Sequence, residues 1–205
     1  MLFRSTLTGA DGTYTGPNAR NGDGVYRAKD VDLYQFQATA GQALTATIKL
    51  PAGGTGTYGY LNIFDKDGIR LYANYWYNFY GSQVVTQDFA FTTTGTYYVG
   101  VSGYYNALYD PKVGGSGYAA YYTGDYNLTL KLKTPAPDTA GDTLTDALAT
   151  GFGPTAGTST TYTGHIGDGL YKYNDVDLYK FQATAGQALT ATIGLPAGVR
   201  EPTAT

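Results

Sequence analysis

The sequence predicts an all-β protein: an antiparallel, jelly-roll-like β-sandwich built as tandem modules, the second of them incomplete. Three observations support this fold class. The chain of 205 residues holds 29 Gly and 22 Tyr, and only 14% of its residues are charged; glycine favours turns, whereas tyrosine and threonine favour strands. Short stretches with alternating apolar side chains recur along the chain. One stretch of 19 residues occurs twice with a single difference.

The repeat organises the whole chain. "DVDLYQFQATAGQALTATI" (residues 30–48) returns as "DVDLYKFQATAGQALTATI" (residues 175–193), an offset of 145 residues. The match extends backward through "YTGPNARNGDGVY" and "YTGHIGDGLY" and forward through "LPAG". We therefore predict three parts: a first module whose front segment is missing, a linker, and the front half of a second module, over residues 1–133, 134–141 and 142–205.

Alternation places the expected strands of the first module in order along the chain. In the first of them, Tyr34 and Phe36 share one face, and in the second, Leu44, Ala46 and Ile48 share one face. The expected strands cover residues 32–39, 42–50, 58–65, 69–73, 82–91, 95–103 and 124–133.

Glycine-containing stretches between these strands indicate where the chain reverses. "DKDG" (residues 65–68) and "TTTGTY" (residues 92–97) both predict hairpin turns, because Gly adopts the positive φ that such turns need. "DTLTDALA" (residues 142–149) is the one weakly helical candidate, with Asp142 placed as a cap.

Composition argues against several classes of function. The net charge of −3 and the lack of a basic run give no reason to expect nucleic-acid binding. No stretch approaches the roughly 20 apolar residues of a membrane helix, so membrane insertion is not expected. The chain has no Cys and one His, His165, and it lacks a Gly-x-Ser-x-Gly elbow. We therefore predict that the protein is not an enzyme.

Aspartates recur at matching positions in both copies. Asp30 and Asp32 are two residues apart, so in an extended chain they face the same side. Calcium takes six to eight oxygen ligands from carboxylates, carbonyls and water. The alternative is that Asp23 is a turn residue and that Asp30 and Asp32 mark a solvated strand start. The predicted calcium ligands are Asp23, Asp30, Asp32, Asp142, Asp146, Asp168, Asp175 and Asp177.

Two aromatic stretches stand out as possible binding surfaces. "YANYWYNFYG" (residues 72–81) holds six aromatics, of which strict alternation could bury about half. We predict partner binding by Tyr75, Trp76, Tyr77, Phe79 and Tyr80; the alternative is a hairpin packed on its own sheet. Residues 103–126 form a long Gly- and Tyr-rich loop in which Asn106 and Asp110 either supply further oxygen ligands or shape turns.

An ordered set of pieces resembles the bacterial pre-peptidase C-terminal domain. They are "DTLTDA", "DVDLYQF", "ATAGQALTATI", "LNIFDKDGIRL", "GTYYVGVSGY" and "GDYNLTLKL". This family's sandwich occurs beside secreted proteases and in tandem in large surface proteins. The resemblance implies an extracellular setting and, as in some members, calcium bound between the acidic lead-in and the "DVD" region. The members of this family that occur in bacterial collagenases bind collagen, so the resemblance makes collagen a candidate ligand.

These observations lead to three hypotheses of function. The first is a non-catalytic structural or adhesive repeat module, stabilised by calcium and secreted or held at the cell surface in an array or filament. Its expected partners are other copies of itself, joined head-to-tail or by strand addition, or an extracellular polymer. The second is a polysaccharide-binding or collagen-like-protein-binding accessory module of a secreted enzyme, and the third is a domain of a secreted protease.

Overall fold

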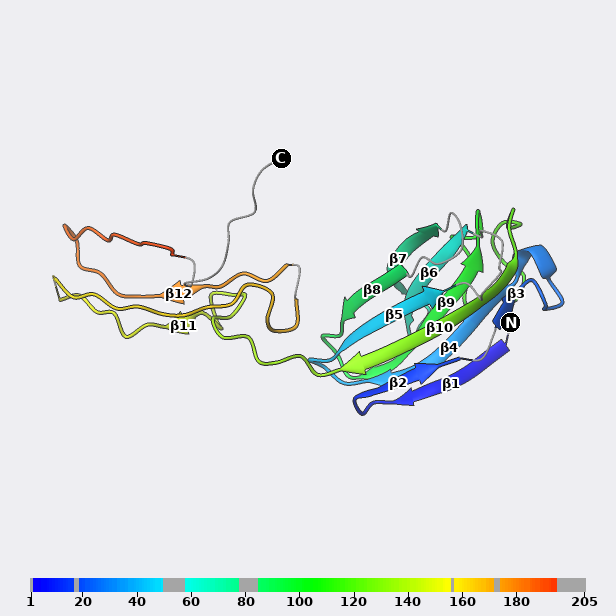
Figure 1. The fold of residues 1–205 in the computed structure, drawn as a ribbon, viewed down its shortest axis with the longest axis horizontal. Coiled ribbons are helices and arrows are strands. Elements are labelled where there is room, and N and C mark those ends of the chain that lie inside the picture. Colours follow the sequence, from blue (N-terminus) through cyan, green and yellow to red (C-terminus); the bar gives the residue numbers. More distant parts are fainter. Residues whose placement is uncertain are drawn as a thin grey trace. The chain divides into compact units, whose positions relative to one another are not determined.

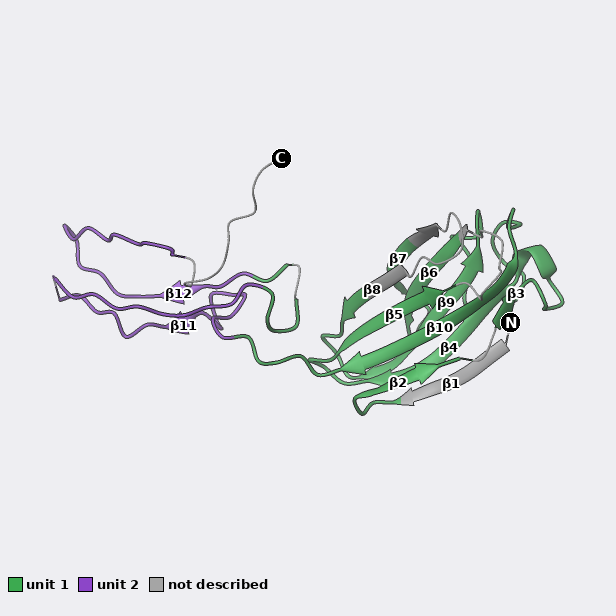
Figure 2. Cartoon of the chain, viewed as in Figure 1, with its two compact units in different colours: residues 1–138, 167–175 green, residues 139–166, 176–205 purple. Residues whose placement is uncertain are grey.

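The computed structural model describes residues 2–16, 19–49, 58–77, 85–155, 157–171 and 174–194. The chain divides into two compact units, residues 1–138 with 167–175 and residues 139–166 with 176–205 (Figure 2). The part of the chain that is described holds no helix that is long and apolar enough to cross a membrane.

The first unit is all-β (Figure 1). Its one helical element among the described residues is a short 3₁₀ turn, η1 (Arg27–Lys29). The strands are β1 (Leu2–Thr8), β2 (Gly12–Thr15), β3 (Ala19–Asn21), β4 (Val31–Ala38), β5 (Ala43–Lys49), β6 (Tyr58–Asp65), β7 (Arg70–Tyr77), β8 (Val85–Ala90), β9 (Gly95–Gly103) and β10 (Gly124–Lys133).

These strands form two sheets packed as a sandwich, which confirms the predicted fold class. One sheet has the order β1-β4-β9-β6-β7 and the other has the order β2-β10-β5-β8, with β3 also pairing with β10. The pairs are antiparallel except β1 with β4, which is parallel. Consecutive strands thus often lie in different sheets, as β4 and β5 do.

The core lies between the sheets and is built by alternate residues. Tyr34 and Phe36 of β4 are buried, as are Leu44, Ala46 and Ile48 of β5, so both predicted inner faces are confirmed. The ring of Phe36 meets two other aromatic rings, Phe91 at 5.7 Å and Tyr97 at 6.0 Å between centroids. A second, smaller cluster lies on the outer face of the first sheet and joins Val31, Leu33, Phe64 and Tyr109.

The structure confirms one predicted hairpin and corrects the other. Between β6 and β7, Gly68 has φ +76° and its N–H donates to the Asp65 carbonyl oxygen at 3.1 Å. "TTTGTY" does reverse the chain, but the prediction that it closes a hairpin is wrong. It connects β8, which pairs with β5, to β9, which pairs with β4 and β6 in the other sheet.

The described part of the second unit contains little regular structure. Its two strands, β11 (Leu148–Ala149) and β12 (Tyr179–Lys180), form a short parallel pair. The weakly helical candidate at residues 142–149, expected to make one or two turns, forms a single turn, in which the Ala147 N–H donates to the Thr143 carbonyl oxygen at 2.8 Å. This turn ends directly at β11, so the chain has no room to continue a helix.

Candidate metal centres

Three predicted aspartates meet at the start of β4. Asp23, Asp30 and Asp32 each offer a carboxylate oxygen, and these atoms all lie within 4.8 Å of one another. Asp30 and Asp32 are buried, with 4% and 5% of their surface exposed, whereas Asp23 is exposed. The alternative of a solvated strand start is therefore wrong. Two buried carboxylates held beside a third repel one another unless a proton, a donor or a cation compensates their charge.

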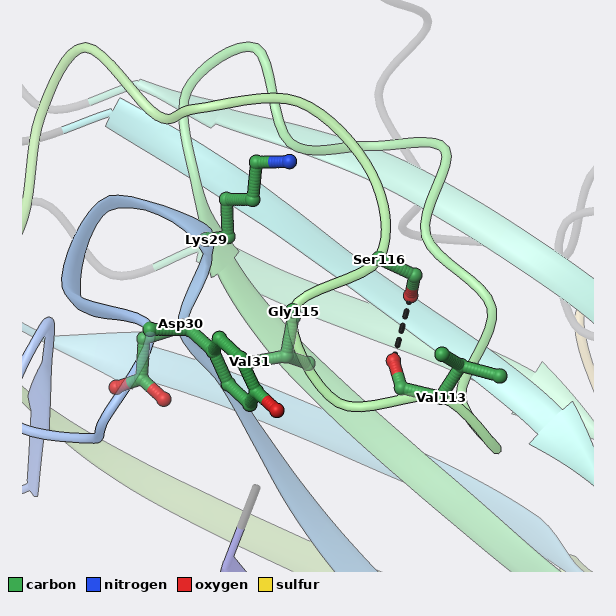
Figure 3. A pocket seen from close by; sticks show the side chains of 7 residues that line it. Lys29, Asp30, Val31, Val113, Gly115 and Ser116 are labelled. Carbon is green, nitrogen blue, oxygen red and sulfur yellow. Dashed lines mark hydrogen bonds between the residues drawn. The ribbon is translucent and has the colours of Figure 1, made fainter.

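The glycine-rich loop before β4 holds the Asp30 carboxylate through backbone donors. The N–H of Gly22 donates to Asp30 Oδ2 at 2.8 Å, and the N–H of Gly24 reaches the same oxygen at 3.4 Å. A Cβ atom at Gly24 would lie 2.6 Å from Asp30 Oδ1, so a side chain at this position would require the loop or the carboxylate to shift. On its other side, Asp30 lines a small pocket with the turn that carries Val113 and Ser116 (Figure 3).

A buried pair of tyrosines holds the Asp32 carboxylate. The Tyr126 hydroxyl, on β10, donates to Asp32 Oδ2 at 2.6 Å. Burial, reinforced by the neighbouring negative charge of Asp32, raises the pKa of Tyr126 well above its usual value, so its phenol stays protonated. Because its one proton is given to Asp32, Tyr126 Oη accepts from the Tyr34 hydroxyl, 2.8 Å away.

The second copy repeats this loop and adds a carboxylate. Asp168 and Asp175 take the places of Asp23 and Asp30, and the Gly167 N–H donates to Asp175 Oδ2 as the Gly22 N–H does to Asp30. Asp138 joins them. Asp177, which follows Asp175 by two residues, is the fourth member of the group, whose oxygens all lie within 4.8 Å of one another.

One oxygen in the second group points to a missing positive partner. Asp175 is only 9% exposed, and its Oδ1 atom is buried with no hydrogen-bond donor among the described residues. A buried carboxylate oxygen in that position costs free energy unless a donor or a cation reaches it. The residues present therefore fit a hard cation. Every side-chain atom that could ligate a metal in the two groups is a carboxylate oxygen, a ligand that suits calcium and does not favour softer metals.

Two of the predicted ligands lie outside both groups. Asp142 Oδ1 accepts from the Val176 N–H at 2.9 Å, and Asp146 Oδ2 accepts from the Thr143 hydroxyl at 2.8 Å. Asp146 stabilises the turn before β11, and Asp142 links that turn to the chain at Val176. Asp138, which the predicted ligand set omits, is the lead-in aspartate that the structure brings to the carboxylates.

The predicted aromatic surface falls largely outside the described residues. The backbone of Tyr75, Trp76 and Tyr77 belongs to β7, but their side chains are not described, and Phe79 and Tyr80 lie outside the described residues. The long loop after β9 is described. Asn106 Oδ1 accepts from the Tyr118 N–H at 3.2 Å, and Asp110 Oδ1 accepts from the Lys112 N–H at 2.8 Å, so both shape turns.

No family model and no curated protein sequence matches the chain. Three solved structures show a likeness over about two thirds of it. PliG of Aeromonas hydrophila, a periplasmic inhibitor of g-type lysozyme, is 15% identical and covers 64% of this chain and 100% of its own, with a TM-score of 0.35. The pre-peptidase C-terminal domain of Bacillus anthracis collagenase is 17% identical and covers 64% of this chain and 98% of its own, with a TM-score of 0.36.

The third structure is CorA of Methylomicrobium album BG8, a surface-associated copper-binding protein. It is 9% identical, covers 65% of this chain and 98% of its own, and has a TM-score of 0.35. The candidate metal centres therefore rest on the carboxylates and the loop geometry of this chain.

Proposed function

We propose that the protein is a non-catalytic, calcium-stabilised β-sandwich module of a secreted or cell-surface array. The observation that carries the proposal is the repetition of one acidic loop, with the same amide-to-carboxylate hydrogen bond, in both copies. Setting and partners follow the expectations from the sequence: an extracellular location, and contacts with further copies of the module or with an extracellular polymer.

A calcium ion in each group would tie the loop to the strand that follows it. Carboxylates that repel one another in the empty group attract the ion when it binds, and the loop glycines allow the backbone to approach closely. In the second group Asp138 lies on the lead-in segment, so the same ion would fix that segment to the loop at Asp168 and Asp175. An ion that binds only the folded chain stabilises it by mass action.

Calcium titration of thermal unfolding tests this proposal. At a calcium concentration one hundred times the Kd, each site should add about 2.7 kcal/mol to the free energy of unfolding. The exposed pair Asp67–Lys66, far from either group in sequence, supplies the matched control. Asp30→Asn and Asp175→Asn should each lower the number of bound ions measured by isothermal titration calorimetry, whereas Asp67→Asn should leave it unchanged. Identical melting curves in calcium and in EDTA would overturn the proposal.

A second candidate function, binding of an extracellular polymer, is favoured by the loop after β9. Tyr105, Tyr118 and Tyr121 expose 58%, 66% and 73% of their surface. Tyr105 also has φ +73°, a backbone conformation that non-glycine residues rarely adopt outside functional or tightly determined sites. Exposed tyrosines present flat apolar faces with a polar tip, which suits sugar rings and protein surfaces.

Pull-down on insoluble polysaccharides and on collagen tests this second function. Tyr121→Ala should reduce retention if the loop binds, and Trp76→Ala should reduce it if the aromatic stretch on β7 binds. Tyr171→Ala, which removes a tyrosine from the second copy instead, serves as the control. Retention that neither Tyr121→Ala nor Trp76→Ala reduces would exclude both aromatic surfaces.

A further inference from the structure

The same side chains have opposite environments in the two copies of the repeated stretch. Phe36, Leu44 and Ile48 of the first copy expose 1%, 0% and 2% of their surface. Their counterparts at the offset of 145 residues, Phe181, Leu189 and Ile193, expose 47%, 51% and 98%. The local sequence is the same, so the difference comes from what covers it. We call residues 30–48 the first acceptor segment and residues 175–193 the second acceptor segment.

The first acceptor segment shows which strands cover such a sequence. Its two strands, β4 and β5, lie in different sheets, and each is paired along its whole length by a strand from residues 95–133. Phe36 lies opposite Tyr97 of β9, Leu44 opposite Leu132 of β10, and Ile48 opposite Leu128 of β10. The second acceptor segment presents the same residues in the same order. The strands that fit it are therefore those of residues 58–133, which we call the donor strands.

Neither the one sequence difference nor the chain connection prevents this pairing. Lys180 replaces Gln35, which is only half-buried, so a lysine there can extend its ammonium group into water. The donor strands end at Lys133, and β11 begins at Leu148. The residues between them can span up to about 45 Å when extended. A strand of the length of β4 spans only about 26 Å.

We propose that the second acceptor segment is a docking surface for the chain's own donor strands, which can pair with either acceptor segment. In the second arrangement, β9 pairs along residues 176–183 and β10 along residues 188–194, in the registers that β4 and β5 now use. Residues of β11 and the chain that follows it take the places of β1 and β2. Donor strands on the same chain are preferred over those of a second copy because a short tether gives an effective concentration in the millimolar range.

A cysteine trap distinguishes the two arrangements, and the native chain has no cysteine to interfere. Gln37 on β4 lies opposite Thr96 on β9, and Gln37 Nε2 donates to Thr96 Oγ1 at 2.9 Å. Facing residues of antiparallel strands have Cα separations of about 4.5–5.5 Å, which a disulfide accepts. Thr96→Cys with Gln37→Cys therefore traps the first arrangement, and Thr96→Cys with Gln182→Cys traps the second.

Each double variant is unfolded, refolded in a glutathione redox buffer and analysed by mass spectrometry after proteolysis. We expect the 96–182 disulfide within monomers in about 0.1–10% of molecules, the usual range for a minor conformation. Thr96→Cys with Thr190→Cys is the register control. Thr190 matches Thr45, whose strand lies in the other sheet, so this pair should stay reduced.

Matched core substitutions then shift the balance in opposite directions. Phe36→Ala should raise the ratio of molecules with the 96–182 disulfide to molecules without it by more than about tenfold, and Phe181→Ala should lower that ratio by a similar factor, because each substitution weakens one arrangement. Three results would overturn the proposal: a 96–182 disulfide no more frequent than the 96–190 disulfide, a fraction that does not respond to Phe36→Ala, or a 96–182 disulfide found only between two chains. The last result would instead indicate strand exchange between copies.

Discussion

Tyr126 donates its phenolic proton to Asp32 across 94 positions of the chain, at a distance of 2.6 Å. Tyr126→Phe removes this hydrogen bond from a buried carboxylate and should lower the free energy of unfolding by about 1–3 kcal/mol. Tyr34→Phe removes the hydrogen bond between the two phenols and should lower the free energy of unfolding by about 1 kcal/mol. Urea denaturation in calcium-free buffer measures both. If the two variants lower the free energy of unfolding equally, the hydrogen bond to Asp32 contributes no more than the bond between the two phenols.

Gly24 should not accept a side chain. An alanine Cβ there would lie 2.6 Å from Asp30 Oδ1, so either the loop or the carboxylate must shift. We expect Gly24→Ala to lower the free energy of unfolding by about 1–3 kcal/mol and to abolish the calcium response of the first group. Gly95→Ala is the control, because the nearest atom to its Cβ would be 4.0 Å away. If calcium stabilises Gly24→Ala as much as it stabilises the native protein, this loop does not take part in metal binding.

The repeated stretch allows a comparison of one substitution in two environments. Leu44→Ala should cost about 2–5 kcal/mol, as for a leucine in a closed core. Leu189→Ala removes the same side chain from a half-exposed position and should cost less than about 1 kcal/mol. Thermal and urea unfolding of the two variants measure the difference. Similar costs would mean that Leu189 is packed in solution.

Asp11 should make the connection after β10 sensitive to acid. The Thr134 N–H donates to Asp11 Oδ2 at 2.8 Å, and Gln42 Nε2 donates to Asp11 Oδ1 at 2.8 Å. These bonds, with that of Thr134 the larger cause, lower the pKa of Asp11. A folded-state pKa below the unfolded value, about 3.9 for Asp, contributes stability above that pH. The contribution is lost as the pH falls through the lowered value.

Comparison of melting temperatures between the native protein and Asp11→Ala tests this pH dependence. The native protein should melt at the higher temperature from neutral pH down to about pH 4, and the two should converge below it. Asp125→Ala removes an exposed carboxylate elsewhere and controls for general charge effects. A difference that persists unchanged at pH 2 would mean that the Asp11 carboxylate is not its source.

Local patterns in the sequence were sufficient for most of the central strands and for one cluster of carboxylates. Alternation placed Tyr34 and Phe36 inside, and the two-residue spacing of Asp30 and Asp32 put both carboxylates on one side. Both signals act over a few residues. Turn chemistry in "TTTGTY" signalled a reversal correctly, but it carries no information about which sheet receives the next strand. That choice depends on the packing of the entire sandwich.

Long-range contacts account for the rest of what sequence reasoning missed. Tyr126 reaches Asp32 from a strand more than ninety residues away, and no spacing rule connects them. The second copy shows the same limit more directly. The stretch that forms all of β4 in the first module forms only the two residues of β12 in the second. Strand formation in this sequence depends on partners that a local pattern does not contain.

The parallel pairing of β1 with β4 has a mechanical consequence for the first module. Leu2 of β1 lies beside Asp32, at the start of β4, whereas Lys133 of β10 lies beside Ala43, at the opposite end of the sandwich. Tension applied at these two points pulls β1 and β10 lengthwise against their neighbours. Every hydrogen bond of those strands is then loaded together in shear, instead of opening one after another from a free end. A module loaded in shear resists stretching much better than one whose hydrogen bonds break one at a time.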